Sequence, residues 1–460
     1  MESEHVNMRD RYANSSFNVG IGEVPEYLQF KKKQLQGCVQ QKKKIKQVLV
    51  HNPNLTAGNI LNIRFASNNF IDPQSVKLGF QFAVKLVNGA NPVGNAKFND
   101  DCALQGMIRS IKVSSAGGGK QLESIYNYNL LQKLQYALSV SQTAKQTQLW
   151  TEGFGSVPGA STITNGPVLV AAAAGVVGTQ YLIPLHTGLL GGNTRLIPNG
   201  LIQLSVDIEL APLLDFCVSA GNVDTTVYYV NNCYVTYDEY IVSDAYRSIF
   251  ESAVRTSGLS FDYNTITNVE TQLAGANLNI QSVVVDSSKQ LLSLYTVMRP
   301  AGATTGTTAT NLETINGSKV TSMQWKVGTV NYPEFVLTNT ADMFQMALQS
   351  MNRAGVLMSS MPISWSKYAG NGRCFFGGVD FEQTRTSPDS NVYSGISTNG
   401  NQITFQATLS DTNVSEANAG AVASANLAHG DGDTGMVIDH FLYHSRILSI
   451  SPVGGVVVDY

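Results

Sequence analysis

The sequence predicts an all-β protein in which one β-domain occurs twice in tandem, and three observations lead to this prediction. Long stretches alternate apolar with polar residues, which is the pattern of a strand with one buried face. Of the 460 residues only 14% are charged, whereas 41 are glycine and 19 are tyrosine. This composition favours strands with long loops. The order of segments in the first half also recurs in the second half, about 200 residues further along the chain.

The alternation is clearest in three segments. Residues 75–87 place six apolar side chains on one face, namely Val76, Leu78, Phe80, Phe82, Val84 and Leu86. Two later segments show the same period of two, with apolar positions at Ile202, Leu204, Val206, Ile208 and Leu210 and at Ile403, Phe405, Ala407 and Leu409. Residues 227–243 and 437–451 add two strands that carry tyrosines. Strands of this kind have one buried and one polar face, as in antiparallel sheets.

Three segments have helical rather than strand periodicity. The spacing of Leu130, Leu131, Leu134 and Leu138 predicts a short surface helix. The segment DAYRSIFESAV predicts a helical connector over residues 244–258. A third helix is predicted to begin at Asn339 or Thr340 as its N-cap and to end before Gly355.

The two halves share one order of segments. An Asn-Gly pair at Gly200 and another at Gly400 each precede a long alternating strand, a variable loop and a tyrosine-bearing strand. A repeat of about 200 residues fits an eight-stranded jelly roll with long loops. We therefore predict two tandem eight-stranded antiparallel jelly rolls with short helices in the loops. The predicted boundaries are 49–243 for the first roll, 244–258 for the connector and 259–460 for the second roll.

Residues 1–48 differ from the rest and are predicted to form a basic N-terminal arm. Seven lysines crowd this segment, namely Lys31, Lys32, Lys33, Lys42, Lys43, Lys44 and Lys46. Such a run is either a solvated arm kept extended by self-repulsion or a contact for an acidic partner, nucleic acid or membrane. Aromatic residues do not interleave the lysines, so base stacking is not indicated. The net charge of −3 excludes a globally basic nucleic-acid coat.

The segment SSAGGGKQ, residues 114–121, invites comparison with a phosphate-binding loop. That motif needs a glycine five positions before its Gly-Lys pair and a Ser or Thr after the lysine. Here those positions hold Ser114 and Gln121, and the preceding residues predict a strand. The glycines are therefore interpreted as a turn between strands.

Other catalytic or metal-binding patterns are weak, so we predict neither enzyme activity nor a cofactor. The five cysteines are scattered without a CxxC pair, which favours reduced thiols. His440 and His444 would face one side of a strand, and Asp431, Asp433 and Asp439 are close in sequence. No third ligand is evident in a fixed geometry, so satisfied or solvated side chains are favoured over a metal site. No Gly-x-Ser-x-Gly elbow occurs. The first ten residues lack an apolar signal-peptide core, so we expect assembly inside a cell.

The chain resembles the double jelly-roll major capsid proteins, and most closely those of polinton-like viruses and virophages. The resemblance lies in the order of LIPLHTGLLGGNTRLIPNGLIQLSVDIEL, YYVNNCYVTYDEYIVS, SGISTNGNQITFQATLS and FLYHSRILSISPVGGVVVDY, and it covers most of the chain after residue 49. It implies a homotrimer that forms a pseudo-hexagonal capsomer and tiles an icosahedral virion shell.

The same resemblance implies several partners: neighbouring capsomers, penton and minor capsid proteins, and the genome or an inner membrane through the lysine-rich arm. Residues 142–178, 301–319 and 411–435 would be tower or inter-subunit loops. Two alternatives stay open at this point, a phage fibre or baseplate protein and a carbohydrate-binding β-sandwich module. The first should lack the duplication, and the absence of a signal peptide weighs against the second.

Overall fold

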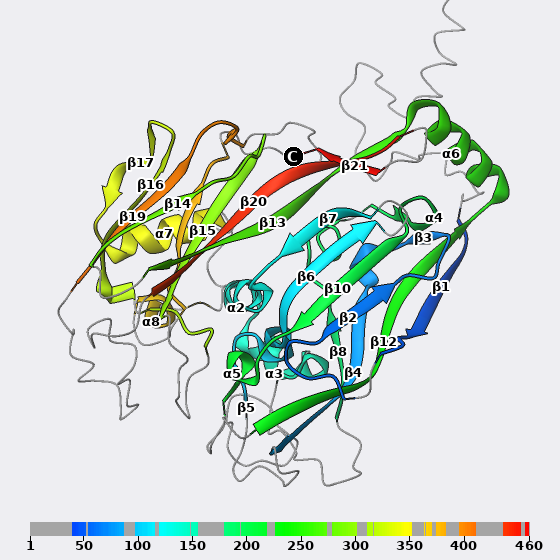
Figure 1. The fold of residues 1–460 in the computed structure, drawn as a ribbon, viewed down its shortest axis with the longest axis horizontal. Helices are drawn as coiled ribbons and strands as arrows, with labels where there is room; N and C mark the ends of the chain where they lie inside the picture. The colour runs from blue at the N-terminus through cyan, green and yellow to red at the C-terminus, as the bar shows by residue number, and fades with distance from the viewer. Residues whose placement is uncertain are drawn as a thin grey trace, which may run out of the picture.

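The structure is a computed structural model of the 460-residue chain. It describes residues 39–51, 54–86, 97–115, 119–147, 149–154, 179–193, 195–218, 226–273, 278–300, 311–315, 317–351, 363, 365–369, 374–382, 395–410, 436–451 and 456–459. Two β-structures lie side by side, one on each side of α6 (Asp244–Ser257) in the sequence (Figure 1).

The first roll consists of two antiparallel sheets. One sheet contains β1 (Val39–Val48), β12 (Thr226–Val242), β4 (Lys77–Leu86) and β8 (Thr179–Pro184), with the short β3 (Phe70–Ile71) and β9 (Ile197–Pro198). The other sheet contains β2 (Ile60–Arg64), β10 (Leu204–Leu210), β6 (Ile108–Ser115) and β7 (Lys120–Ile125). A further short pair joins β5 (Lys97–Phe98) to β11 (Cys217–Val218).

The second roll has the same construction. Its first sheet contains β13 (Leu259–Leu273), β20 (Met436–Ile450), β15 (Leu291–Pro300) and β18 (Gly377–Asp380), with β21 (Val456–Asp459) beside β20. Its second sheet contains β14 (Asn279–Val284), β19 (Ile403–Leu409), β16 (Val320–Val327) and β17 (Val330–Leu337).

The strand order proves the duplication. Each roll has eight main strands, counted here in sequence order. One sheet of each roll joins the first, eighth, third and sixth of these strands, as β1-β12-β4-β8 and β13-β20-β15-β18. The other sheet sets the second, seventh, fourth and fifth together, as β2-β10-β6-β7 and β14-β19-β16-β17. This is the strand order of the jelly roll, so the predicted fold class is confirmed.

The helices occupy equivalent loops, as the repeated sequence order predicted. In each roll a helix follows the fifth long strand: α2 (Tyr128–Ser139) after β7 and α7 (Thr340–Ser350) after β17. Asn339 caps α7, because its side-chain oxygen accepts a hydrogen bond from the backbone of Asp342 at 2.8 Å. The two Asn-Gly pairs precede β10 and β19, but only Gly400, with φ of 77°, makes a left-handed turn. Asn199 instead begins the short helix α4 (Asn199–Ile202).

Two features of the first roll differ from what the sequence indicated. Residues 39–48, assigned to the basic arm, form β1, the first strand of the first sheet. The helix α2 was predicted to lie on the surface, and this was wrong, because nearly all of its residues are buried. Figure 1 shows α2 between the two rolls, and the second roll contacts the helix at Lys133, which donates to Glu313.

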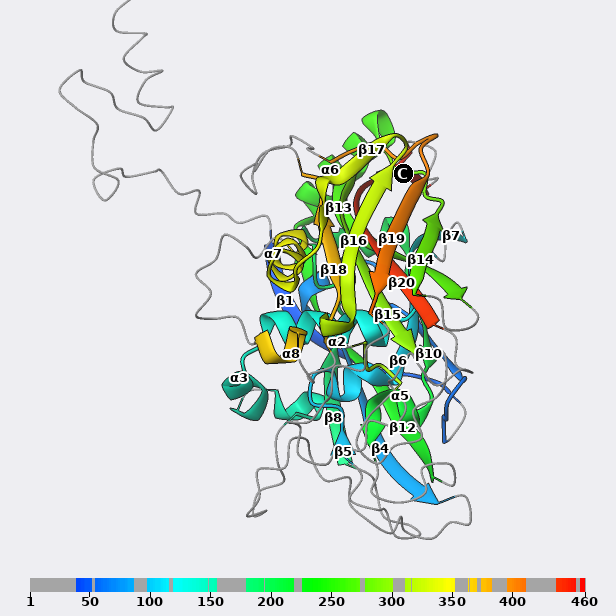
Figure 2. The ribbon, with the colours of Figure 1, turned by 90° about the vertical axis from the view of Figure 1, so that its left-hand side faces the viewer.

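Each roll has an aromatic core between its sheets. In the first roll Phe82 stacks on Tyr228 at 5.6 Å and meets Phe216 edge-on at 6.0 Å. In the second roll Trp325 is fully buried, packs on Phe405 at 5.4 Å and donates from its indole nitrogen to Thr296 at 3.0 Å. Seen from the side, β16, β19 and β14 form the outer face of the second roll (Figure 2).

Candidate functional site

The lysine segment lies on strand β1, which pairs only with β12 among the described strands and therefore exposes its other edge. Lys42, Lys43, Lys44 and Lys46 are all exposed there, whereas Lys31, Lys32 and Lys33 lie outside the described residues. The structure thus spreads the positive charge along a sheet edge. Lysines at such an edge also oppose pairing with another strand.

The lysines of β1 rest on residues of β12. Lys42 lies 2.9 Å from a carboxylate oxygen of Asp238, and this hydrogen bond raises the pKa of Lys42 above its usual range. Lys46 lies 4.0 Å from the ring centre of Tyr234 in a cation–π contact. Among the described residues, only Lys42 of this group forms an ion pair. Lys43, Lys44 and Lys46 are exposed and make no ion pair within the part of the chain that the structure describes.

A buried ionic cluster joins the two rolls, and no sequence pattern indicated it. Asp101, from the first roll, accepts hydrogen bonds from Lys145 at 3.0 Å and from Lys367 of α8 (Trp365–Ala369) at 2.8 Å. Burial alone would raise the pKa of Asp101, but Lys145 and Lys367 lower it well below its usual range. The Cys374 thiol also donates to Asp101 at 3.4 Å.

A second ion pair lies nearby. Lys133 of α2 is fully buried and donates to Glu313 at 3.0 Å and to the carbonyl of Leu312 at 3.1 Å. Both contacts cross from the first roll to the second. The sequence showed only a lysine within the apolar segment LLQKLQYAL, which did not indicate this buried pair.

Further polar contacts continue this interface along β7, β13 and β20. Tyr263 and Arg446 both donate to the carbonyl of Leu122, at 2.8 and 3.2 Å. Asn127, at the start of α2, donates to the buried carboxylate of Asp439 at 2.5 Å. Contacts of this density between residues far apart in sequence hold the two rolls in one arrangement.

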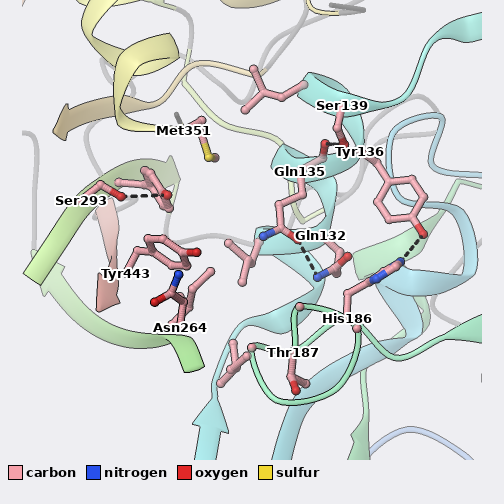
Figure 3. Close-up of a pocket in the computed structure, with 18 of the residues that line it drawn as sticks. Gln132, Gln135, Tyr136, Ser139, His186, Thr187, Asn264, Ser293, Met351 and Tyr443 are labelled. Atoms are coloured by element: carbon pink, nitrogen blue, oxygen red, sulfur yellow. Dashed lines mark hydrogen bonds between the residues drawn. The ribbon is translucent and has the colours of Figure 1, made fainter. Parts of the chain in front are cut away.

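A polar cleft of about 970 Å³ opens between the rolls (Figure 3). Gln132, Gln135 and Tyr136 of α2 line one wall, and Asn264, Ser293 and Tyr443 of the second roll lie opposite. Its hydroxyl groups are engaged within the protein. Tyr136 donates to Glu152 at 2.5 Å, and Ser293 donates to the Tyr295 hydroxyl at 2.9 Å. No hydrogen-bonded serine–histidine pair lines the cleft in the described part of the chain.

His440 and His444 are core residues. His440 contacts Ser282 at 2.9 Å and Thr296 at 3.0 Å through its two ring nitrogens, and burial lowers its pKa to about 3. His444 is also buried, with its pKa lowered to about 3 by burial and by Arg446. No group of three potential metal ligands occurs among the described residues. No helix in this part of the chain is long and apolar enough to span a membrane.

The glycine-rich segment connects two paired strands. Strands β6 and β7 flank it in antiparallel register, with Ser115 opposite Lys120, and Gly119 has φ of 61°. A phosphate-binding loop would lead into a helix, whereas Lys120 begins a strand. The interpretation as a turn between strands is therefore confirmed.

Comparison with known proteins identifies solved structures of similar architecture. No protein-family model matches the chain, and no curated protein matches its sequence. Among solved structures it is similar to VP54 of PBCV-1, as fitted into a reconstruction of the virophage Sputnik, with 13% identity, a TM-score of 0.58, and 94% of this chain and 99% of that chain covered.

Two further structures are similar over almost their whole length. The Faustovirus major capsid protein has 8% identity and a TM-score of 0.57, with 97% of this chain and 98% of that chain covered. The mavirus major capsid protein has 10% identity and a TM-score of 0.52, with 96% and 94% covered. The chain therefore has the double jelly-roll fold found in viral major capsid proteins.

Proposed function

We propose that this chain is the major capsid protein of an icosahedral DNA virus, a structural subunit of the virion shell without enzymatic activity. One observation carries the proposal: the same eight-strand roll occurs twice in one chain, and buried ionic and polar contacts lock the two rolls together. Three copies of a rigid tandem of rolls present six similar units around a threefold axis. This gives a nearly sixfold capsomer suited to tiling a shell.

The low charge of the chain supports an assembling role. Interface cores are depleted in charged residues, and a subunit surrounded by other capsid proteins has little free surface. We expect homotrimers, contacts with neighbouring capsomers, and contacts with penton and minor capsid proteins at the vertices and inner side.

Light scattering coupled to size exclusion tests the proposal first, followed by electron microscopy of the purified chain. We expect a stable trimer of the 49.5 kDa chain and particles with a hexagonal outline. A monomer that binds glycans would instead identify a carbohydrate-binding module. An elongated fibre or a baseplate-like ring would support the phage alternative. Either result would contradict the capsid proposal.

We further propose that the lysine segment contacts phosphate groups on the inner side of the shell, on the genome or on an inner membrane. Lys43, Lys44 and Lys46 carry the argument, because they are exposed and make no ion pair among the described residues. Lys31, Lys32 and Lys33 precede them, and Lys42 shares its charge with Asp238. Together these residues form the candidate acidic-partner contact.

Charge removal tests this contact. We expect Lys43→Gln, Lys44→Gln and Lys46→Gln together to weaken binding to duplex DNA. The slope of the logarithm of the binding constant against the logarithm of salt concentration should become shallower by up to about 0.9 per lost phosphate contact. The control replaces three exposed lysines elsewhere, Lys112, Lys120 and Lys326, by glutamine. Anionic and neutral vesicles distinguish a membrane partner. Unchanged binding to both DNA and vesicles, with aggregation instead, would show that the lysines only protect the sheet edge.

A further inference from the structure

The two opposite ends of the molecule carry large apolar side chains that an isolated monomer would leave exposed to water. Figure 1 places β17 and α7 at the far end of the second roll, and β1 and α6 at the far end of the first roll. Copies arranged head to tail in a closed ring need two different, complementary surfaces, one at each end. The inference below identifies these surfaces and rests on the proposed trimer.

The two rolls provide an internal comparison, because β2-β10-β6-β7 and β14-β19-β16-β17 are equivalent sheets. The outer face of the first sheet is charged, with Arg64, Lys112, Asp207 and Glu209 on it. The outer face of the second is neutral: Gln281, Gln406 and Gln324 lie in register across three strands. Lys326 is the one charged residue at the outward positions of β14, β16 and β19. A large charge-poor face is typical of a covered surface.

The edge of this neutral face is apolar. Strand β17 exposes Val330, Phe335 and Val336, and the side chain of Phe335 is 60% exposed. Figure 2 shows β17 and α7 on the side of the molecule that faces away from the first roll. The neighbouring Glu334 is exposed as well. An exposed aromatic beside an acidic residue is a suitable anchor for a neighbouring protein.

The opposite end has a matching groove. A hollow of about 250 Å³ lies beside α6, with apolar lining from Val39, Leu196, Tyr246 and Phe250. Ile249 of the same helix is 69% exposed. Arg195 also lines the hollow and is exposed, so it gives the groove a positive charge. The groove therefore combines an apolar hollow with positive charge, which complements Phe335 and Glu334.

We propose that Phe335 of one copy inserts into the groove beside α6 of the next copy, with Glu334 facing Arg195. The neutral outer face of β14-β19-β16-β17 then covers the end of the neighbouring first roll. Repeating this contact three times closes a ring, and each copy uses both of its ends once. The occupant of the groove is thus a second copy of this chain.

Cysteine cross-linking tests the contact in the full-length chain. The described native cysteines are buried, and Cys38→Ser removes the remaining one. In this background we expect the double variant Phe335→Cys with Ile249→Cys to form disulfide-linked dimers and closed trimers under mild oxidation. Each single variant should form none, because a head-to-tail contact never brings two copies of the same residue together. Ile249→Cys with Val457→Cys is the control, since Val457 is 51% exposed and lies on β21, which belongs to neither surface.

Substitutions give an independent measurement. We expect Phe335→Asp to raise the trimer dissociation constant by roughly tenfold or more, as for a buried interface anchor, whereas Val457→Asp leaves it unchanged. Glu334→Lys should weaken the trimer, and adding Arg195→Glu should restore it. Far-UV circular dichroism of each variant confirms that the fold is retained.

The outcomes separate this inference from the proposed function. A wild-type trimer in which the double variant fails to cross-link would overturn the contact and leave the capsid role standing. A wild-type monomer at every concentration would instead contradict the trimer itself. A third outcome concerns the N-terminal segment of the same chain. In this outcome, the thiol introduced by Ile249→Cys resists alkylation in the monomer and becomes reactive when Tyr27→Ser and Phe30→Ser remove two aromatic side chains of that segment. The groove would then hold the chain's own N-terminal segment, and the contact would be overturned.

Discussion

Gly79 shows how one residue on the outer face of the first roll is constrained by its neighbour across the strands. Gly79 of β4 lies opposite Tyr234 of β12, and a Cβ atom on Gly79 would overlap the tyrosine ring. Gln180 donates to the Tyr234 hydroxyl at 2.8 Å, and Lys46 covers the ring. The ring thus fills the space that the glycine leaves, and it also supports the lysine strand β1.

This stack predicts a non-additive pair of substitutions. We expect Gly79→Ala to lower the free energy of unfolding by roughly 1–3 kcal/mol, because the ring must move out of its place. In Tyr234→Ala the obstacle is absent, so the same glycine substitution should cost little there. Urea unfolding of the two single variants and the double variant measures the coupling. Equal costs in both backgrounds would show that the ring does not fix Gly79.

The buried histidines predict a loss of stability in mild acid. Burial lowers the folded-state pKa of His444 to about 3, whereas its unfolded value is about 6.5. The unfolded chain therefore binds the proton first, and the stability present above pH 6.5 is lost as the pH falls toward 3. Neither ring nitrogen of His444 has a hydrogen-bond partner among the described residues. We expect His444→Leu to raise the melting temperature and to flatten its decline between about pH 7.5 and 5.

His440 is the matched control for this prediction, since burial lowers its pKa to about 3 as well. Its ring nitrogens contact Ser282 and Thr296, so His440→Leu would leave two buried hydroxyls with fewer partners. That variant should flatten the pH dependence but lower the melting temperature at about pH 7.5. Identical pH profiles for wild type and His444→Leu would contradict the assignment of the acid sensitivity to this residue.

At the level of elements, the strands were predictable and the burial of α2 was not. The alternation at Phe80 and Phe82 fixes which face of β4 is inside, because neighbouring side chains on a strand point to opposite sides. In α2 the leucines were assigned correctly to a buried face. The helix was expected at the surface, since nothing local indicates that a second roll covers the face with Lys133. The partner Glu313 is 180 residues away, beyond the reach of any local pattern.

The buried pair on α2 has a measurable consequence. Lys133→Met leaves the Glu313 carboxylate without its lysine, and we expect a loss of about 3–5 kcal/mol in the free energy of unfolding. Lys133→Met with Glu313→Met removes both charges and should recover most of it. The exposed pair of Arg109 and Glu209, at 3.5 Å, is the control, and Arg109→Met should cost no more than about 1 kcal/mol. A small effect of Lys133→Met would show that Glu313 finds another partner or water.

For the whole molecule, the repeated order of segments in the sequence predicted the duplication, because topology follows from the order of strands and loops. The contacts that hold one roll against the other were not predictable, since they join single polar residues scattered over the chain. Asp101, Lys145 and Lys367 carry no motif, and only the fold brings them together. The same holds for the lysine segment: its charge was evident, whereas its place in β1 depends on pairing with β12 nearly 200 residues later.

If the Asp101 cluster locks the two rolls, opening of the interface should expose Cys374. This thiol is buried at the cluster, and burial raises its pKa to about 12, so it should resist alkylation in the closed state. Asp101→Asn removes the negative charge between Lys145 and Lys367. We expect it to raise the alkylation rate of Cys374 by roughly tenfold for each 1.4 kcal/mol lost from the opening free energy.

Cys233 provides the internal reference for this measurement, because it is buried in β12 within the first roll and does not lie at the cluster. Mass spectrometry of both peptides gives the ratio of the two rates. A rise in Cys374 labelling alone means that the rolls separate while each stays folded, as two domains held by one interface would. A parallel rise at both cysteines would mean that the chain unfolds as one unit, and the cluster would then stabilise the fold without acting as a lock between rolls.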